Sequence, residues 1–254
     1  MENENGYVKR EVLKKGLLQI TFFHPKHNSL PSNLLQLLVA YITEAGEDDT
    51  VQVIILKSGG NRTFCAGASF DELMAIDDFD TGKQFFMGFA NVINACRKCP
   101  KLIVGRVQGK AVGGGVGVAA AVDYCLATKY AAVKLSELNV GIGPFVVGPA
   151  VIRKIGLSAM SQLTINANTF QSAQWAKEKG LYAEVYDSVE ELEEGVAKMT
   201  DYLLATNPTA QTLLKQSFWE NCTHWDELLA QRAEMSGQLV LSDYTKAALK
   251  KHGA

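Results

Sequence analysis

The chain has 254 residues, of which 47% are hydrophobic and 20% charged, and its formal net charge is −2. This composition is typical of a globular protein and argues against disorder. The near-neutral charge gives no reason to expect a nucleic-acid-binding surface, and the longest apolar run, residues 112–122, is too short and glycine-rich to span a membrane.

The cysteines and the N-terminal residues bear on the compartment. Five cysteines are an odd number in a large chain, which argues against a disulfide framework and favours a reducing compartment. Residues 1–6 are acidic and polar and do not follow the signal-peptide pattern. We therefore expect a cytoplasmic protein.

Strands and helices alternate through about residue 186, and helical patterns dominate beyond residue 146. The expected elements, in chain order, are strand 17–23, a helix that Pro31 opens and that runs to 45, strand 51–56, helix 81–98, strand 102–107, helix 116–122, strands 123–127 and 132–135, strand 183–186, and a helical stretch at 210–241. The β-branched run 51–56 is typical of a strand buried on both faces. This alternation predicts an α/β protein.

Two glycine-containing corners each follow an expected strand. The first is residues 63–70 (TFCAGASF), and the second is residues 109–117 (GKAVGGGVG). Small residues let a ligand approach the backbone, and the unpaired amides at a helix start favour negative charge. If the corners converge, two N–H groups meet one oxygen, as in an oxyanion hole.

Two other interpretations of Gly113, Gly114 and Gly115 stay open on the residues alone. The triple glycine is also typical of close helix packing against a sheet. A phosphate loop fits less well, because no Gly-Lys-Ser/Thr ending follows and the G-x-G-x-x-G pattern is not met cleanly.

Taken together, five segments resemble the motifs of one family, the crotonase (enoyl-CoA hydratase/isomerase) superfamily. They match in order and spacing over roughly residues 7–220. They are HPKHNSL (24–30) against R-P-x-x-x-N-A-L, FCAGA (64–68) against F-x-A-G-A-D, QGKAVGGG (108–115) against N-G-x-A-x-G-G-G, AVDY (121–124) against C-D-I, and SELNVGIGP (136–144) against P-E-x-x-x-G-x-x-P.

The resemblance implies a fold and a set of partners. It implies a spiral of ββα units over residues 1–190 that carries the coenzyme A and active sites, followed by a helical oligomerisation segment at 191–254. It further implies a homotrimer or homohexamer, an acyl-CoA substrate, no permanently bound cofactor and no metal. Coenzyme A enters only as part of the substrate.

The same resemblance assigns candidate site residues. The amides of Ala68 and Gly114 would bind the thioester oxygen, with Ala66, Gly67, Gly113 and Gly115 shaping the two corners. Glu137 aligns with a family glutamate and would act as the acid/base. Lys26 matches a stretch that lies along coenzyme A, although a solvated turn lysine is an equal alternative. We expect the pocket walls to come from residues 70–89 and 145–155.

One departure leaves the reaction open. Hydratases of the family that use two glutamates place one of them where this chain has Gly117. Moving a double bond needs only one base, whereas hydration divides naturally between two carboxylates. Hydration of a 2-enoyl-CoA and 3-to-2 double-bond isomerisation both remain candidates, and Asp71 or Glu72 is a minor candidate for a second carboxylate.

Other functions also remain open. A methylglutaconyl-CoA-type hydratase of branched substrates, a decarboxylase or thioesterase on the same scaffold, and a non-catalytic CoA- or RNA-binding protein are the alternatives. The C-x-x-C at Cys96 and Cys99 ends a helix before a strand, so we expect neither redox nor metal chemistry there.

Overall fold

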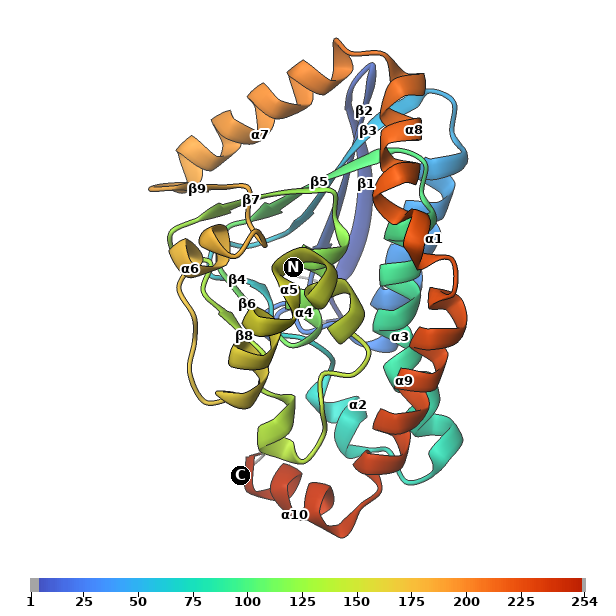
Figure 1. Cartoon of the computed structure of the whole chain (residues 1–254), viewed down its shortest axis with the longest axis vertical. Coiled ribbons are helices and arrows are strands. Elements are labelled where there is room, and N and C mark those ends of the chain that lie inside the picture. The colour runs from blue at the N-terminus through green and yellow to red at the C-terminus, as the bar shows by residue number, and fades with distance from the viewer. Residues whose placement is uncertain (1–4, 253–254) are drawn as a thin grey trace.

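The computed structural model describes residues 5–252, so most of the N-terminal stretch used above against a signal peptide lies outside the described residues (Figure 1). The strands are β1 (Tyr7–Lys14), β2 (Gly16–Phe23), β3 (Val51–Ser58), β4 (Thr63–Cys65), β5 (Leu102–Val107), β6 (Lys110–Val112), β7 (Tyr124–Thr128), β8 (Val133–Lys134) and β9 (Glu184–Tyr186). The helices are α1 (Ser32–Glu47), α2 (Phe70–Met74), α3 (Phe79–Lys98), α4 (Gly114–Ala121), α5 (Gly148–Ile165), α6 (Ala173–Glu178), α7 (Val189–Leu204), α8 (Pro208–Trp219), α9 (Trp225–Val240) and α10 (Asp243–His252), with short 3-10 helices η1 (Glu137–Val140) and η2 (Glu220–Cys222).

Two sheets form the centre of the fold. The larger has the order β1-β2-β3-β5-β7-β9, in which only β1 and β2 pair antiparallel, and the smaller has the parallel order β4-β6-β8. The α/β architecture predicted from the sequence is confirmed.

Helices cover both faces of the larger sheet, as Figure 1 shows, with α7 on one side and α1 and α3 on the other. On β3, Val53 and Ile55 pack in a core cluster with Leu192 and Val196 of α7, whereas Ile54 and Leu56 belong to the cluster on the α1 side. The two-residue period of a strand produces this division, and it explains why residues 51–56 are apolar at nearly every position.

Three expectations about element bounds need correction. Pro31 is the N-cap of α1 and not its first residue, and α4 begins at Gly114 rather than near Val116. In the smaller sheet, β8 lies within the strand expected at 132–135, but β4 and β6 were not predicted, because strands of three residues are too short to display a two-residue period.

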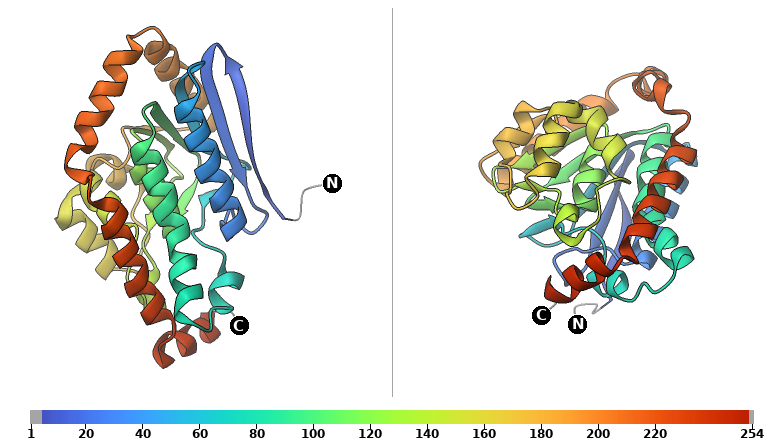
Figure 2. Two further views of the ribbon diagram at one scale, coloured as in Figure 1. Left: turned by 90° about the vertical axis from the view of Figure 1, so that its right-hand side faces the viewer. Right: turned by 60° about the horizontal axis from the view of Figure 1, so that its bottom comes forward.

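The C-terminal helices pack on the core of their own chain. Helix α9 lies along α3, as the left view of Figure 2 also shows, and the two backbones meet where Gly82 faces Gly237. A Cβ atom on Gly237 would lie 2.9 Å from the backbone nitrogen of Lys83, so this approach requires glycine. Among the described residues, no helix combines the length and apolarity that crossing a membrane requires.

A buried ion pair ties α8 to the sheet. The Lys215 ammonium lies 2.8 Å from the Asp123 carboxylate, and their side chains are only 2% and 5% exposed. The ammonium also donates to the Lys101 carbonyl at 2.7 Å, and the carboxylate accepts from the backbone N–H of Ile103 at 2.8 Å. These bonds compensate for removing both charges from water.

Replacing Lys215 with methionine should therefore destabilise the protein strongly. The variant leaves the Asp123 carboxylate buried without a cation, which typically costs about 3–5 kcal/mol. Lys14→Met is the matched control, because Lys14 pairs with Asp201 at the exposed surface, where such pairs contribute about 0–1 kcal/mol. Urea unfolding would measure both, and equal losses of stability in the two variants would contradict this account of the pair.

Candidate active site

The two glycine-containing corners lie against each other. Strands β4 and β6 are parallel neighbours, so the segments that follow them emerge side by side. A Cβ atom on Gly67 would lie 3.2 Å from the Val112 carbonyl oxygen and 3.5 Å from the Gly114 nitrogen. Gly67 also has φ +92°, so the backbone conformation favours glycine there and the space for a side chain is tight.

Each corner presents an unpaired amide. Leu30 brackets Ala68 by donating to the Gly67 carbonyl at 2.8 Å and accepting from the Ser69 N–H at 3.3 Å, so the Ala68 N–H faces away from Leu30. Gly114 is the first residue of α4, where a helix N–H has no partner within the helix. Within residues 5–252, neither amide donates a hydrogen bond.

The three consecutive glycines have different structural roles. Gly113 is the N-cap of α4 and has φ +54°, which favours glycine. A Cβ atom on Gly114 would lie 2.3 Å from the Phe89 ring, and one on Gly115 would lie 2.5 Å from the Cys65 carbonyl oxygen. Gly115 is a packing residue outside the cavity lining, as the helix-packing interpretation of the sequence allowed.

A cavity of about 350 Å³ opens beside the two corners, and it is lined by Ala66, Gly67, Ala68, Gly113 and Gly114 on that side. Most of the remaining wall is hydrocarbon, which is usual for small-molecule sites. The apolar side chains include Phe70, Leu73, Phe85, Phe86, Phe89, Val140, Ile142, Phe145, Val146 and Val147. The wall expected from residues 70–89 contributes five side chains to this list, whereas only the first three residues of the expected wall 145–155 line the cavity.

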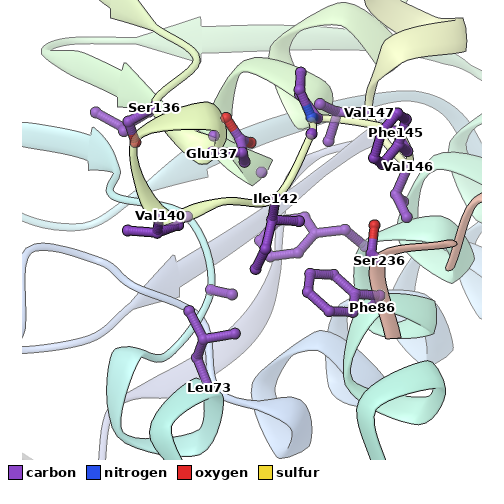
Figure 3. A pocket seen from close by; sticks show the side chains of 18 of the residues that line it. Leu73, Phe86, Ser136, Glu137, Val140, Ile142, Phe145, Val146, Val147 and Ser236 are labelled. Carbon is purple, nitrogen blue, oxygen red and sulfur yellow. The ribbon is translucent and has the colours of Figure 1, made fainter. Parts of the chain in front are cut away.

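Glu137 extends into this cavity from η1, with Phe86 and Ser236 on the other side of the view in Figure 3. Its Oε1 atom lies 3.1 Å from where a Cβ atom of Gly113 would be, so the carboxylate rests against bare backbone next to the second corner. Its Oε2 atom is buried and has no hydrogen-bond partner among the described residues. Burial raises the pKa of Glu137 to about 7.

The position of the absent family glutamate is filled by a valine. A Cβ atom on Gly117 would lie 2.5 Å from Cγ1 of Val147, so a longer side chain at position 117 would collide with a residue of the cavity wall. The other two acidic candidates lie elsewhere. Asp71 pairs with Lys26 at the surface, and Glu72 accepts from the N–H and hydroxyl of Ser32 at the start of α1. Glu137 is thus the one carboxylate of the lining within the described part of the chain.

Lys26 and the cysteines are not part of the cavity lining. Lys26 is exposed on the turn after β2. Cys65, beside the first corner, is buried, and burial raises the pKa of its thiol to about 12, so it is not a nucleophile at neutral pH. Cys96 and Cys99 are buried at the end of α3, and burial raises the pKa of both thiols, as expected for structural cysteines.

Sequence reasoning missed several residues of the wall, among them Val140, Ile142 and Ser236. Val140 and Ile142 flank the end of η1, and Ser236 comes from α9, in the segment expected to serve oligomerisation. The family motif around Glu137 points to the first two. No local pattern identifies Ser236, because its place depends on the docking of α9 against α3.

Comparison with known proteins finds the family whose motifs the sequence resembles. Residues 13–253 match the family model described as enoyl-CoA hydratase/isomerase. The chain is 23% identical to a trans-2-decenoyl-[acyl-carrier-protein] isomerase of Streptococcus mutans, over 93% of this chain and 91% of that protein. It is 30% identical to a mitochondrial methylglutaconyl-CoA hydratase of Mus musculus, over 74% of this chain and 60% of that protein.

The fold has close counterparts among solved structures. An enoyl-CoA hydratase from Bacillus halodurans superposes with a TM-score of 0.89 at 21% identity, covering 96% of this chain and 99% of that one. The match to the family model, over most of the chain, shows that this protein is a member of the enoyl-CoA hydratase/isomerase family of enzymes.

Proposed function

We propose that this protein is an enoyl-thioester double-bond isomerase that moves the double bond of a 3-enoyl-CoA to position 2. The observation that carries the proposal is Glu137, the single carboxylate of the cavity lining within the described residues, together with the occupation of the second glutamate's place by Val147. Isomerisation needs one group to carry a proton between two carbons. Hydration needs an activated water as well, and an apolar wall offers that water no second base.

The proposed reaction has two proton transfers. The Glu137 carboxylate takes a proton from C2, and the electron pair of that C–H bond moves into a dienolate that spans the thioester and C3=C4. The Glu137 carboxylic acid then returns the proton to C4, which leaves the double bond between C2 and C3. A carboxyl group with a pKa of about 7 is suited to both steps near neutral pH, because it loses and regains the proton with similar ease.

The unpaired amides of Ala68 and Gly114 support the same chemistry. Negative charge builds on the thioester oxygen as the dienolate forms, and two preorganised N–H donors would stabilise it. Removing one such donor typically costs about 10²–10³-fold in rate. The contact between Gly67 and Gly114 is what would keep the two donors aimed at one point.

The lining also indicates the acyl group. Besides Glu137, Lys134 is the only charged side chain that lines the cavity among the described residues, and its ammonium lies over the Phe170 ring, 5.3 Å from the centroid. Apart from that lysine, the described lining offers no cation to a second carboxylate on the acyl group, and a carboxylate buried without a cation is costly. We therefore propose an uncharged hydrocarbon acyl group, unlike a methylglutaconyl group. Lys26, whose surface pair with Asp71 is weak, is available to the phosphates of coenzyme A.

Chromatographic separation together with mass spectrometry of the products would test the reaction, because an isomer has the same mass as its substrate and a hydration product is heavier by one water. Purified protein is incubated separately with a 3-enoyl-CoA and a 2-enoyl-CoA of the same chain length. We expect the 3-enoyl-CoA to give an isomer of unchanged mass, and Glu137→Gln to slow that reaction about 10²–10⁴-fold. Because the base must be ionised, kcat/KM should fall below a pH of about 7. A product heavier by one water from the 2-enoyl-CoA, with no isomerisation, would favour a hydratase that uses Glu137 alone.

The protonation of Glu137 should also make the free energy of unfolding depend on pH. Its folded pKa lies above the ordinary value of 4.5, so the folded state holds this proton more tightly than the unfolded state does. The stability contributed by the proton is complete below pH 4.5 and is lost as pH rises to about 7. Glu137→Gln should therefore be more stable than the wild type by up to about 3 kcal/mol at pH 8, and less so at pH 5. A difference that is independent of pH in urea unfolding would refute this.

Helix α8 supports the expected self-association. Leu213, Leu214 and Phe218 on this helix are 61%, 49% and 46% exposed, which is unusual for large apolar side chains that gather on one short helix. We propose that they are covered by other copies in a homotrimer or homohexamer. Sedimentation analysis should give one of these states, and Leu213→Glu with Leu214→Glu should weaken it. A stable wild-type monomer would exclude this role for α8.

A further inference from the structure

The C-terminal helix α10 contacts the turn that carries Glu137. The Thr245 hydroxyl donates to the Gly141 carbonyl at 3.3 Å, across 104 residues of sequence. Thr245 is fully buried although most of its helix is exposed. Gly141 is the left-handed C-cap of η1, and a Cβ atom on it would lie 2.6 Å from Oγ1 of Thr245. Helix α10 therefore docks closely on the end of η1.

The same turn holds the backbone of Glu137. The backbone N–H groups of Gly141 and Ile142 both donate to the Glu137 carbonyl, the latter at 3.0 Å. The bonds thus run from the Thr245 hydroxyl to Gly141, and from the Gly141–Ile142 backbone to Glu137. Hydrophobic contact reinforces this docking, because Leu249 of α10 packs in one cluster with Ile142 and Phe85, which both line the cavity.

We infer that Thr245 is a positioning residue for Glu137, and that α10 fixes the turn η1 so that the carboxylate stays against Gly113 and out of water. This inference rests on the proposed role of Glu137 as the acid/base. The backbone N–H groups that interact with the Glu137 carboxyl are those of Ser136 and Glu137 in the same turn, and its Oε2 atom has no partner within the described residues, so its position depends on the turn itself. The carboxylate can hold its place only if the backbone beneath it is held.

The charges around Glu137 do not offer a competing explanation. Strand β8 contributes Lys134, whose ammonium lies over the Phe170 ring. Helix α3 contributes phenylalanines and α9 contributes Ser236. Within the described residues, the charged side chains of α10, Asp243, Lys246, Lys250 and Lys251, are exposed and outside the lining. Access of water is therefore what loosening η1 would change.

Thr245→Val removes the hydroxyl and keeps the shape of the side chain. We expect kcat on the 3-enoyl-CoA to fall by up to about 10²-fold with little change in KM, because a shift of about 1 Å at the reacting group has that effect. Water admitted to the carboxylate would also lower its pKa, so the midpoint of the kcat/KM profile should move at least about one pH unit toward acid. Thr245→Ser retains the donor and should restore both values.

Thr200→Val is the matched control. Thr200 is equally buried on a helix, and its hydroxyl also donates to backbone carbonyls, Val196 and Ala197, but α7 covers the other face of the larger sheet. It should lose stability as Thr245→Val does without a change in the pH profile. The inference is overturned if folded Thr245→Val keeps the wild-type rate and midpoint, or if it loses rate with an unmoved midpoint, as a purely structural residue would.

A second measurement separates this inference from the proposed reaction. Carbon NMR of protein labelled at the glutamate carboxyl carbons follows the titration of Glu137 directly, with its signal assigned by its absence in Glu137→Gln. The midpoint should fall from about 7 in the wild type toward the ordinary 4.5 in Thr245→Val. This titration can be measured even if the wild type does not isomerise a 3-enoyl-CoA. Such a failure would contradict the proposed function but not the positioning role of Thr245. An unchanged carboxyl titration in Thr245→Val would defeat the positioning role.

Discussion

A carboxyl group that is buried beside a glycine corner, with one oxygen that has no hydrogen-bond partner among the described residues, is the constraint on which this site depends. Burial disfavours the charged form of Glu137 and brings its pKa close to neutrality. The free-energy cost of burying this ionisable group is tolerated only because the residues around it are fixed in place. Gly113 leaves room for the carboxylate, and Val147 fills the space that a second acid would need. Helix α10 contacts the end of η1 through the hydrogen bond from Thr245 to Gly141.

The fold serves this constraint by bringing distant segments to one edge. Strands β4 and β6 are very short, yet their parallel pairing puts Gly67 against Gly114. Phe89 of α3 then packs over Gly114, and α9 closes the cavity by lying along α3. A Cβ atom on Gly67 would press on the Val112 carbonyl oxygen, and one on Gly114 would collide with the Phe89 ring, so a larger residue at either position would disturb the two corners. The apolar wall and the amides are therefore consequences of one packing arrangement.

Much of this could be predicted from the sequence. The run at 51–56 identifies a strand with helices on both faces, the family motifs locate Ala68, Gly114 and Glu137, and Gly117 raises the question of a second acid. What the sequence could not reveal are contacts made across long separations. The smaller sheet has strands too short for a period, Ser236 reaches the cavity only through helix docking, and the bond from Thr245 to Gly141 spans 104 residues. The identity of Val147 as the residue that fills the vacant place likewise required the packing of α5 against α4.

The central claim is that one carboxyl group carries one proton between two carbons inside a cavity that excludes water. The most direct test is the fate of deuterium placed at C2 of a 3-enoyl-CoA when the enzyme acts in ordinary water. The account predicts that part of the deuterium appears at C4 of the 2-enoyl-CoA product, because Glu137 returns the atom that it removed. Complete loss of deuterium to the solvent in a single turnover, with C4 carrying only solvent hydrogen, would contradict a single shielded base.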